Sequence, residues 1–107
     1  MKRGDIVTVA MAGDFGKPRP ALIVQADRFM GHTSITVLLM TGDLHDAPEL
    51  RITVQPTPEN GLRQPSQIMV DRTMTAPRGK IGRRIGRLDP DALIAVNRSL
   101  AVFLGIA

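Results

Sequence analysis

The sequence predicts an α+β fold, a small antiparallel β-barrel followed by one C-terminal α-helix, and three observations support this. Several short segments are rich in β-branched residues and either alternate or are continuously apolar. Glycine- and proline-rich stretches separate them, and helical spacing of apolar residues occurs only at the end of the chain. A chain of 107 residues, 43% of them hydrophobic, is expected to form one domain over residues 1–107.

Four segments fill the first half of the chain. Asp5–Met11 alternates apolar with polar residues and is predicted to be a strand, whereas two glycines and two prolines make Ala12–Pro20 a loop. Ala21–Ala26 and Ser34–Thr41 are almost continuously apolar, which is typical of central strands covered on both faces.

The second half adds shorter strands. Glu49–Pro56 alternates as a half-buried strand does, and Ser66–Thr75 and Gly82–Leu88 are predicted to be further strands. Between them, Thr57–Leu62 begins with a capping threonine followed by proline and reaches a glycine soon after, so it is expected to form one helical turn at most.

The last segment changes to helical spacing. Asp89 is a favourable N-cap and Pro90 suits the first helical position. Apolar residues then recur three and four positions apart, which predicts an amphipathic helix over residues 90–104. These residues are Leu93, Ile94, Val96, Leu100, Phe103 and Leu104. Such a stripe is more typical of core than of an interface.

Charge and cysteine content restrict the function. The formal charge of +4 and the pI near 10.7 favour an anionic partner, either nucleic acid or an acidic protein. Six basic residues and no acid occur between Arg72 and Arg87, although such runs are also typical of a solvated face. The absence of cysteine excludes disulfides, thiolate zinc sites and cysteine nucleophiles. With no secretory or membrane-spanning segment, we expect a cytoplasmic protein that does not bind membranes.

Few residues could perform catalysis. The segment Thr41–Glu49 contains Asp43, His45, Asp46 and Glu49, but this composition is more typical of an exposed loop than of a metal site, and we expect no metal. Neither a phosphate-binding glycine-rich loop nor a serine triad is supported.

Three residues at predicted strand ends offer a different chemistry: Arg19, Thr41 and Asp71. An arginine fork matches two phosphate oxygens, a threonine hydroxyl can add a donor, and a carboxylate can exchange a proton. Together they could promote attack on a phosphate by a neighbouring 2′-hydroxyl. A structural salt bridge is the commoner role for an arginine at such a position.

Five strings in order carry a family resemblance: KRGDIVTV, GKPRPALIVQ, VLLMT, PSQIMVDRTMT and IGRRIGRLD, followed by the final helix. In order and spacing, the chain resembles the MazF/PemK family of toxin ribonucleases over essentially its whole length. The resemblance implies an SH3-like barrel that forms a homodimer and cleaves single-stranded RNA, usually mRNA. It also implies cleavage without metal or other cofactor, leaving a 2′,3′-cyclic phosphate, and a cognate antitoxin with an acidic tail.

The resemblance also assigns residues. Arg19, Thr41 and Asp71 match the family's catalytic positions, and Ser66 matches a serine that opens the same strand as Asp71. Lys17, Phe15 and Arg72 are expected to contact RNA with Ser66. The chain departs from the family by the extra Pro18 before Arg19, by a first loop without the histidine that some members use, and by Met74 where many relatives have arginine.

Two alternatives keep a similar fold without RNA cleavage. One is a toxin similar to the CcdB gyrase poisons, which would act by binding a protein and would use the C-terminal helix. The other is a non-catalytic small barrel that binds RNA or protein through its arginines.

Overall fold

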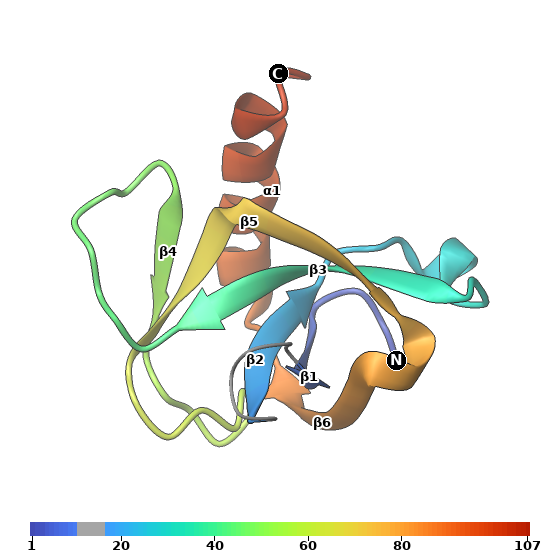
Figure 1. The fold of residues 1–107 in the computed structure, drawn as a ribbon. Helices are drawn as coiled ribbons and strands as arrows, with labels where there is room; N and C mark the ends of the chain where they lie inside the picture. Colours follow the sequence, from blue (N-terminus) through green and yellow to red (C-terminus); the bar gives the residue numbers. More distant parts are fainter. Residues whose placement is uncertain (11–16) are drawn as a thin grey trace.

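The computed structural model describes residues 1–10 and 17–107, in which six antiparallel strands form one bent sheet with a helix on one side (Figure 1). The strands are β1 (Asp5–Ala10), β2 (Pro18–Ile23), β3 (Ser34–Thr41), β4 (Arg51–Val54), β5 (Ser66–Pro77) and β6 (Ile81–Arg87). They lie in the order β4-β5-β3-β2-β1-β6. The short 3-10 helices η1 (Asp27–Phe29) and η2 (Arg78–Lys80) and the helix α1 (Pro90–Phe103) are the other regular elements described. The predicted α+β class with one C-terminal helix is confirmed.

Each face of the sheet carries a buried core, and successive side chains of a strand contribute to the two cores in turn. A first core lies on the side of α1, and it comprises Ile6, Leu22, Leu38, Met40, Val54, Ile68, Leu88 and Val96. A second core lies on the other face, and it comprises Val7, Val9, Ala21, Ile23, Ile35, Val37 and Ala76. The two-sided coverage predicted for the central strands is therefore confirmed. Each fully buried side chain of this size contributes about 1.5–3 kcal/mol.

The strand β2 begins earlier than predicted. The prediction that the loop Ala12–Pro20 extends to residue 20 is wrong, because Pro18, Arg19 and Pro20 pair with β1. Pairing of β2 with β3 begins only at Ala21. Proline lacks a backbone donor, so it is tolerated where a strand is paired on one side only. The predicted strand also ends early, at Ile23 rather than residue 26.

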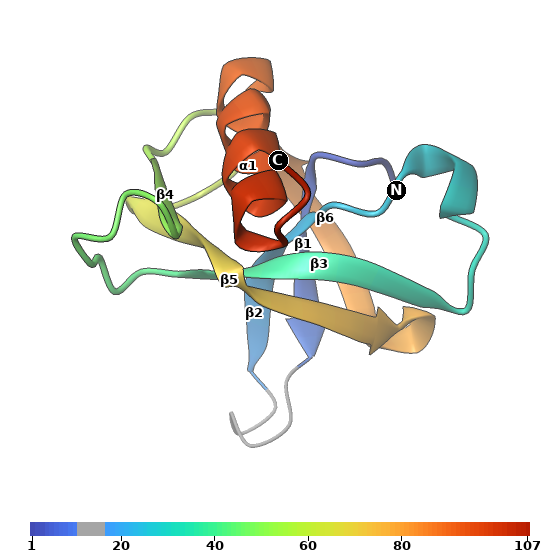
Figure 2. The same ribbon diagram turned by 90° about the horizontal axis from the view of Figure 1, so that it is seen from above.

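A bend in β5 brings β4 into the sheet. Two steps along β3, from Leu38 to Met40, correspond to five along β5, from Thr73 to Ile68. The surplus residues of β5 form a bulge, which bends a strand and increases its twist. Before the bulge β5 pairs with β4 as well as β3, and after it β5 continues along β3 to Pro77 (Figure 2).

The edge strands β4 and β6 are not paired with each other, so hydrogen bonds do not close the sheet into a full barrel in the described part of the chain. The turn over residues 57–61 lies between them. Asn60 Nδ2 donates to the carbonyl of Gln55 (2.8 Å), and the amide of Arg87 donates to the carbonyl of Glu59 (2.8 Å). The approach is so close that a Cβ on Gly86 would lie 2.3 Å from the carbonyl carbon of Asn60. The predicted helical turn is a single hydrogen-bonded turn.

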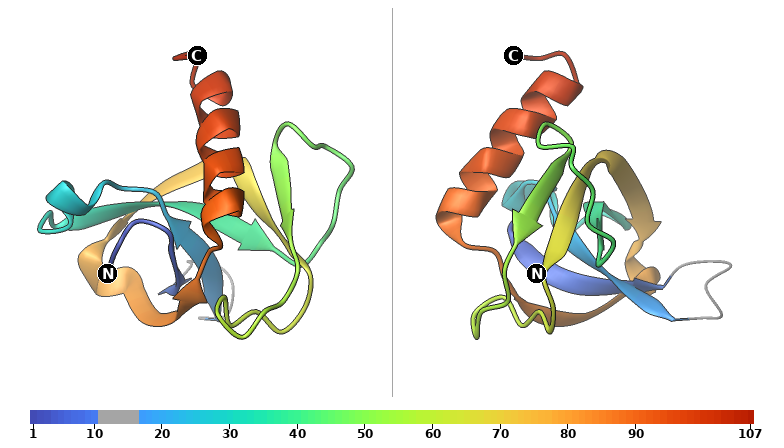
Figure 3. Two further views of the ribbon diagram at one scale, coloured as in Figure 1. Left: turned by 180° about the vertical axis from the view of Figure 1, so that it is seen from behind. Right: turned by 90° about the vertical axis from the view of Figure 1, so that its left-hand side faces the viewer.

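The helix α1 packs across the back of the sheet against β4 and β5 (Figure 3). Its start is fixed by Asp89, whose carboxylate accepts from the amides of Asp91 (3.1 Å) and Ala92 (3.2 Å). The predicted boundaries agree with the observed helix to one residue. Among the described residues, no helix is both long enough and apolar enough to cross a membrane.

Candidate active site

The ends of four strands place polar residues in one row. Thr41 pairs with Gln67, and Gln67 pairs with Thr53 on β4. Arg19 lies two residues before Ala21, and Thr41 lies two residues after Leu39, with which Ala21 pairs, so the alternation of side chains puts both on the same face of the sheet. Residues directly opposite on neighbouring strands share a face of the sheet. We call Arg19, Thr41, Gln67 and Thr53 the strand-end row, and it extends the face of the second core.

The hydroxyl of Thr41 is held in place by the turn that follows β3. Its Oγ accepts a hydrogen bond from the amide of Asp43 (3.1 Å), and the residue is half-buried. A hydroxyl that accepts one bond still has a proton to donate. Thr41 can therefore close this turn and offer a donor to a phosphate oxygen at once.

Gln67 fixes the connection between β3 and β4, a role that sequence reasoning missed. The residue is 4% exposed. Its Oε1 accepts from the amide of His45 (2.9 Å), while its Nε2 donates to the carbonyl of His45 (2.9 Å) and to Thr53 Oγ1 (3.1 Å). A glutamine directly before the apolar run of residues 68–70 was the signal that could have found it, since a buried amide needs partners.

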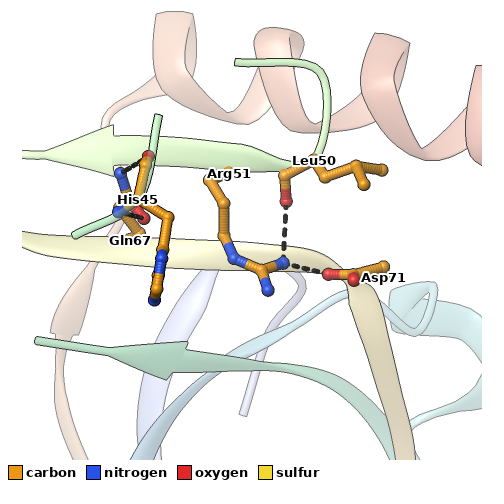
Figure 4. A network of polar contacts seen from close by, with 5 residues as sticks. All are labelled: His45, Leu50, Arg51, Gln67 and Asp71. Atoms are coloured by element: carbon orange, nitrogen blue, oxygen red, sulfur yellow. Dashed lines mark hydrogen bonds and ion pairs between the residues drawn. The ribbon is translucent and has the colours of Figure 1, made fainter. Parts of the chain in front are cut away.

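Asp71 lies in the bulge of β5 and is paired with Arg51 of β4 (Figure 4). Arg51 Nη1 donates to Asp71 Oδ1 and more weakly to the carbonyl of Leu50 (3.4 Å). The side chains are 14% and 25% exposed, respectively, so the ion pair is partly screened from water. Arg51 Nε is buried, and the described residues supply it with no hydrogen-bond partner. The sequence analysis did not single out Arg51.

Ser66 lies beside the row but lines a different surface, because it precedes Gln67 by one residue and so points to the opposite face. There it lines a groove of about 400 Å³ with prolines of β2, residues 61–64 and part of β6. Two exposed arginines, Arg63 and Arg83, belong to this groove, and none of the described residues that line it is acidic. The groove therefore suits a polyanion with apolar bases.

The remaining predicted RNA contacts lie at the edges of the site. Lys17 immediately precedes β2, and Arg72 immediately follows Asp71; both are exposed. Phe15 lies outside the described residues. Within residues 1–10 and 17–107, no group of three or more histidine or acidic side chains is placed to hold a metal ion.

Comparisons with known proteins agree on one family. The family model described as "PemK-like, MazF-like toxin of type II toxin-antitoxin system" matches residues 2–104. The chain is 48% identical over 108 residues to a protein of Mycolicibacterium smegmatis named "Probable endoribonuclease MazF", covering 100% of this chain and 99% of that one.

Solved structures show the same fold. The Mycobacterium tuberculosis toxin MazF-mt6 matches with a TM-score of 0.80 and 26% identity, over 95% of this chain and 98% of that one. An endoribonuclease in complex with its cognate antitoxin, from a mycobacterial species, also gives a TM-score of 0.80, at 20% identity over 100% of this chain and 97% of that one.

Proposed function

The chain belongs to the PemK-like, MazF-like toxin family of type II toxin–antitoxin systems and is an endoribonuclease; we propose that it cuts single-stranded RNA by attack of a 2′-hydroxyl on the adjacent phosphate. The observation that supports this mechanism is the strand-end row, in which Arg19 and Thr41 lie on the same face at neighbouring ends of β2 and β3. The alternative of a gyrase-binding toxin is not favoured, because the 48% identical relative is named as an endoribonuclease.

The proposed roles follow from the chemistry of phosphate. The Arg19 guanidinium binds two non-bridging oxygens of the scissile phosphate, and the Thr41 hydroxyl donates to one of them. Such donors stabilise the additional charge that develops as the 2′-oxygen bonds to phosphorus, and each contributes about 3–4 kcal/mol in comparable sites. The Asp71 carboxylate is the proposed proton acceptor. The products are a 2′,3′-cyclic phosphate and a 5′-hydroxyl.

The rest of the RNA is proposed to follow the basic surface around the strand-end row. In this proposal Lys17 and Arg72 contact flanking phosphates, and Phe15, a residue of the first loop in the sequence, contacts the RNA. Ser66 and the arginines of its groove bind the nucleotides beyond, where apolar walls can contact bases. Because these donors supply the charge stabilisation, the proposed reaction requires no metal ion.

Two protein partners are proposed. The first is a cognate antitoxin with an acidic segment, as family membership and the net charge of +4 support. The second is a copy of this chain, supported by an exposed apolar patch at the C-terminal end of α1. The patch comprises Val102, Phe103, Leu104 and Ile106, which are 47–77% exposed. Light scattering after size-exclusion chromatography tests this dimer. We place the toxin in the cytoplasm, where its proposed mRNA substrate lies.

The direct test of function is RNA cleavage in excess EDTA, with the 5′ ends of the products mapped. We expect cuts at a short recurring sequence, and we expect Arg19→Ala to reduce their rate by about 100- to 1000-fold, because one preorganised donor group is lost. Arg19→Lys should restore only part of this rate, since an ammonium cannot bind two oxygens as a planar fork does. Cleavage that disappears with EDTA, or that persists in Arg19→Ala, would contradict the mechanism.

A further inference from the structure

The proposed cleavage needs a proton donor as well as an acceptor. As the 2′-oxygen attacks, its proton must go to a base, and the departing 5′-oxygen must gain a proton to leave as a hydroxyl. Asp71 is suited only to the first task. Its Oδ1 accepts from Arg51, and an ionised carboxylate can accept a proton but has none to donate. A different group must therefore serve the 5′-oxygen.

His45 lies near the strand-end row because Gln67 holds it there. Gln67 binds both the amide and the carbonyl of His45, and Gln67 is also the partner of Thr41 in the sheet. The His45 backbone is thus fixed beside the residue that pairs with Thr41, although it belongs to a long connection. This fixation is unusual for an exposed loop histidine, and it limits where the imidazole can reach.

The imidazole projects toward the side of β5 on which the other charged groups of the site lie. Figure 4 shows the His45 ring and the Arg51 guanidinium extending from the strand pair in the same direction. Within residues 1–10 and 17–107, no hydrogen bond, ion pair or ring contact engages the imidazole, and the residue is exposed. The ring is therefore accessible to a substrate on this face.

We propose that His45 is the general acid of the cleavage step, a role that rests on the proposed ribonuclease function. The 2′-oxygen bonds to phosphorus and its proton passes to the Asp71 carboxylate. The bond between phosphorus and the 5′-oxygen breaks, and that oxygen takes a proton from the His45 imidazolium. Water returns both groups to their starting states after the products leave.

Other charged groups lie around the imidazole. Arg51 of β4 and Asp71 of β5 form an ion pair, and Arg19 of β2 belongs to the strand-end row. The connection itself adds Asp43, Asp46 and Glu49. The control is therefore a second histidine far from this cluster.

His32 provides that control. It precedes β3, whereas His45 follows it, and the seven steps from Ser34 to Thr41 span about 23 Å. His32 also lies in contact with the ring of Phe29, away from the strand-end row. The variants His45→Gln and His32→Gln make the same chemical change at opposite ends of one strand.

The experiment uses the full-length toxin and an oligonucleotide that contains its mapped cleavage sequence. One version carries the normal 5′-oxygen, and the other carries a bridging 5′-sulfur, a leaving group that does not need protonation. We expect His45→Gln to cut the oxygen substrate about 100-fold or more slowly than the unsubstituted toxin, with RNA affinity unchanged. The sulfur substrate should restore most of that loss, whereas His32→Gln should match the unsubstituted toxin on both.

Normal cleavage by His45→Gln, or an equal defect on both substrates, would overturn the general-acid role while leaving the ribonuclease intact. Absence of cleavage by the unsubstituted toxin would instead reject the proposed function, and the His45 role with it.

Discussion

Replacing Gln67 by methionine tests whether the strand-end row depends on the connection that follows β3. Methionine fills a similar volume but makes none of the three side-chain hydrogen bonds of Gln67, at 2.9, 2.9 and 3.1 Å. Each bond is worth about 1 kcal/mol net. His45 is exposed, so water replaces part of the loss, and we expect the free energy of unfolding to fall by about 2 kcal/mol. For a domain of this size, that lowers the melting temperature by about 10 °C.

The same substitution should reduce catalysis beyond its effect on stability. Once the connection is released, His45 is no longer fixed beside Thr41, so we expect kcat to fall at least about 10-fold at a temperature where the variant is fully folded. Circular dichroism melting and RNA cleavage measure the two effects. Gln55→Met is the matched control, because Gln55 is an exposed glutamine at the end of β4. A Gln67→Met protein with unchanged melting temperature and unchanged kcat would show that Gln67 does not hold the connection in place.

One further prediction concerns the gap between the edge strands β4 and β6, and another concerns the groove that Ser66 lines. Gly86→Ala should lower the free energy of unfolding by about 2–3 kcal/mol in urea titrations, because its Cβ meets backbone atoms at 2.3–2.5 Å. Gly79→Ala should change the free energy of unfolding by less than about 0.5 kcal/mol, because no atom lies within 4 Å of the added Cβ. Equal effects of the two substitutions would contradict the close approach of Gly86 to the turn over residues 57–61. Arg63→Ala and Arg83→Ala should each reduce the slope of log RNA affinity against log salt by about 0.7, whereas Arg98→Ala on α1 should not. An unchanged slope would remove the groove from the RNA path.

Local patterns predicted most of the fold, because each element carries its own signal. Continuous apolar runs located the central strands, and Asp89 with Pro90 located the start of α1. The predicted start of β2 was wrong because a proline pair usually marks a loop. Here the prolines are tolerated within the strand, because it is paired on one side only at that point. Whether residues 18–20 also pair with β3 depends on that neighbouring strand, and the sequence around the prolines does not specify it.

The site was less predictable because it depends on strand register. Arg19 and Thr41 could be selected as strand-end residues, but the face that they share follows from the pairing of Ala21 with Leu39. Gln67 and Arg51 were missed for the same reason. Each acquires its role from a partner on another segment: Gln67 from the connection after β3, and Arg51 from the bulge that carries Asp71.

The basic run near the C-terminus shows why charge counts overestimate RNA contacts. Of its six basic residues, Arg84 donates to the nearly buried carboxylate of Asp5 (3.1 Å), and Arg78 donates to main-chain carbonyls before β3. Arg87 lines a separate hollow together with acidic residues. Structural roles therefore occupy part of this run.

The basic residues near the proposed RNA path are Lys17, Arg19, Arg63, Arg72 and Arg83, all exposed. If each neutralises one phosphate of a single strand, the slope of log affinity against log salt should be about −3.5. All 14 lysines and arginines acting together would instead give about −10. The absolute slope thus distinguishes two kinds of binding. Binding by the strand-end row and the groove that Ser66 lines limits the number of phosphate contacts, whereas diffuse attraction to a basic protein does not.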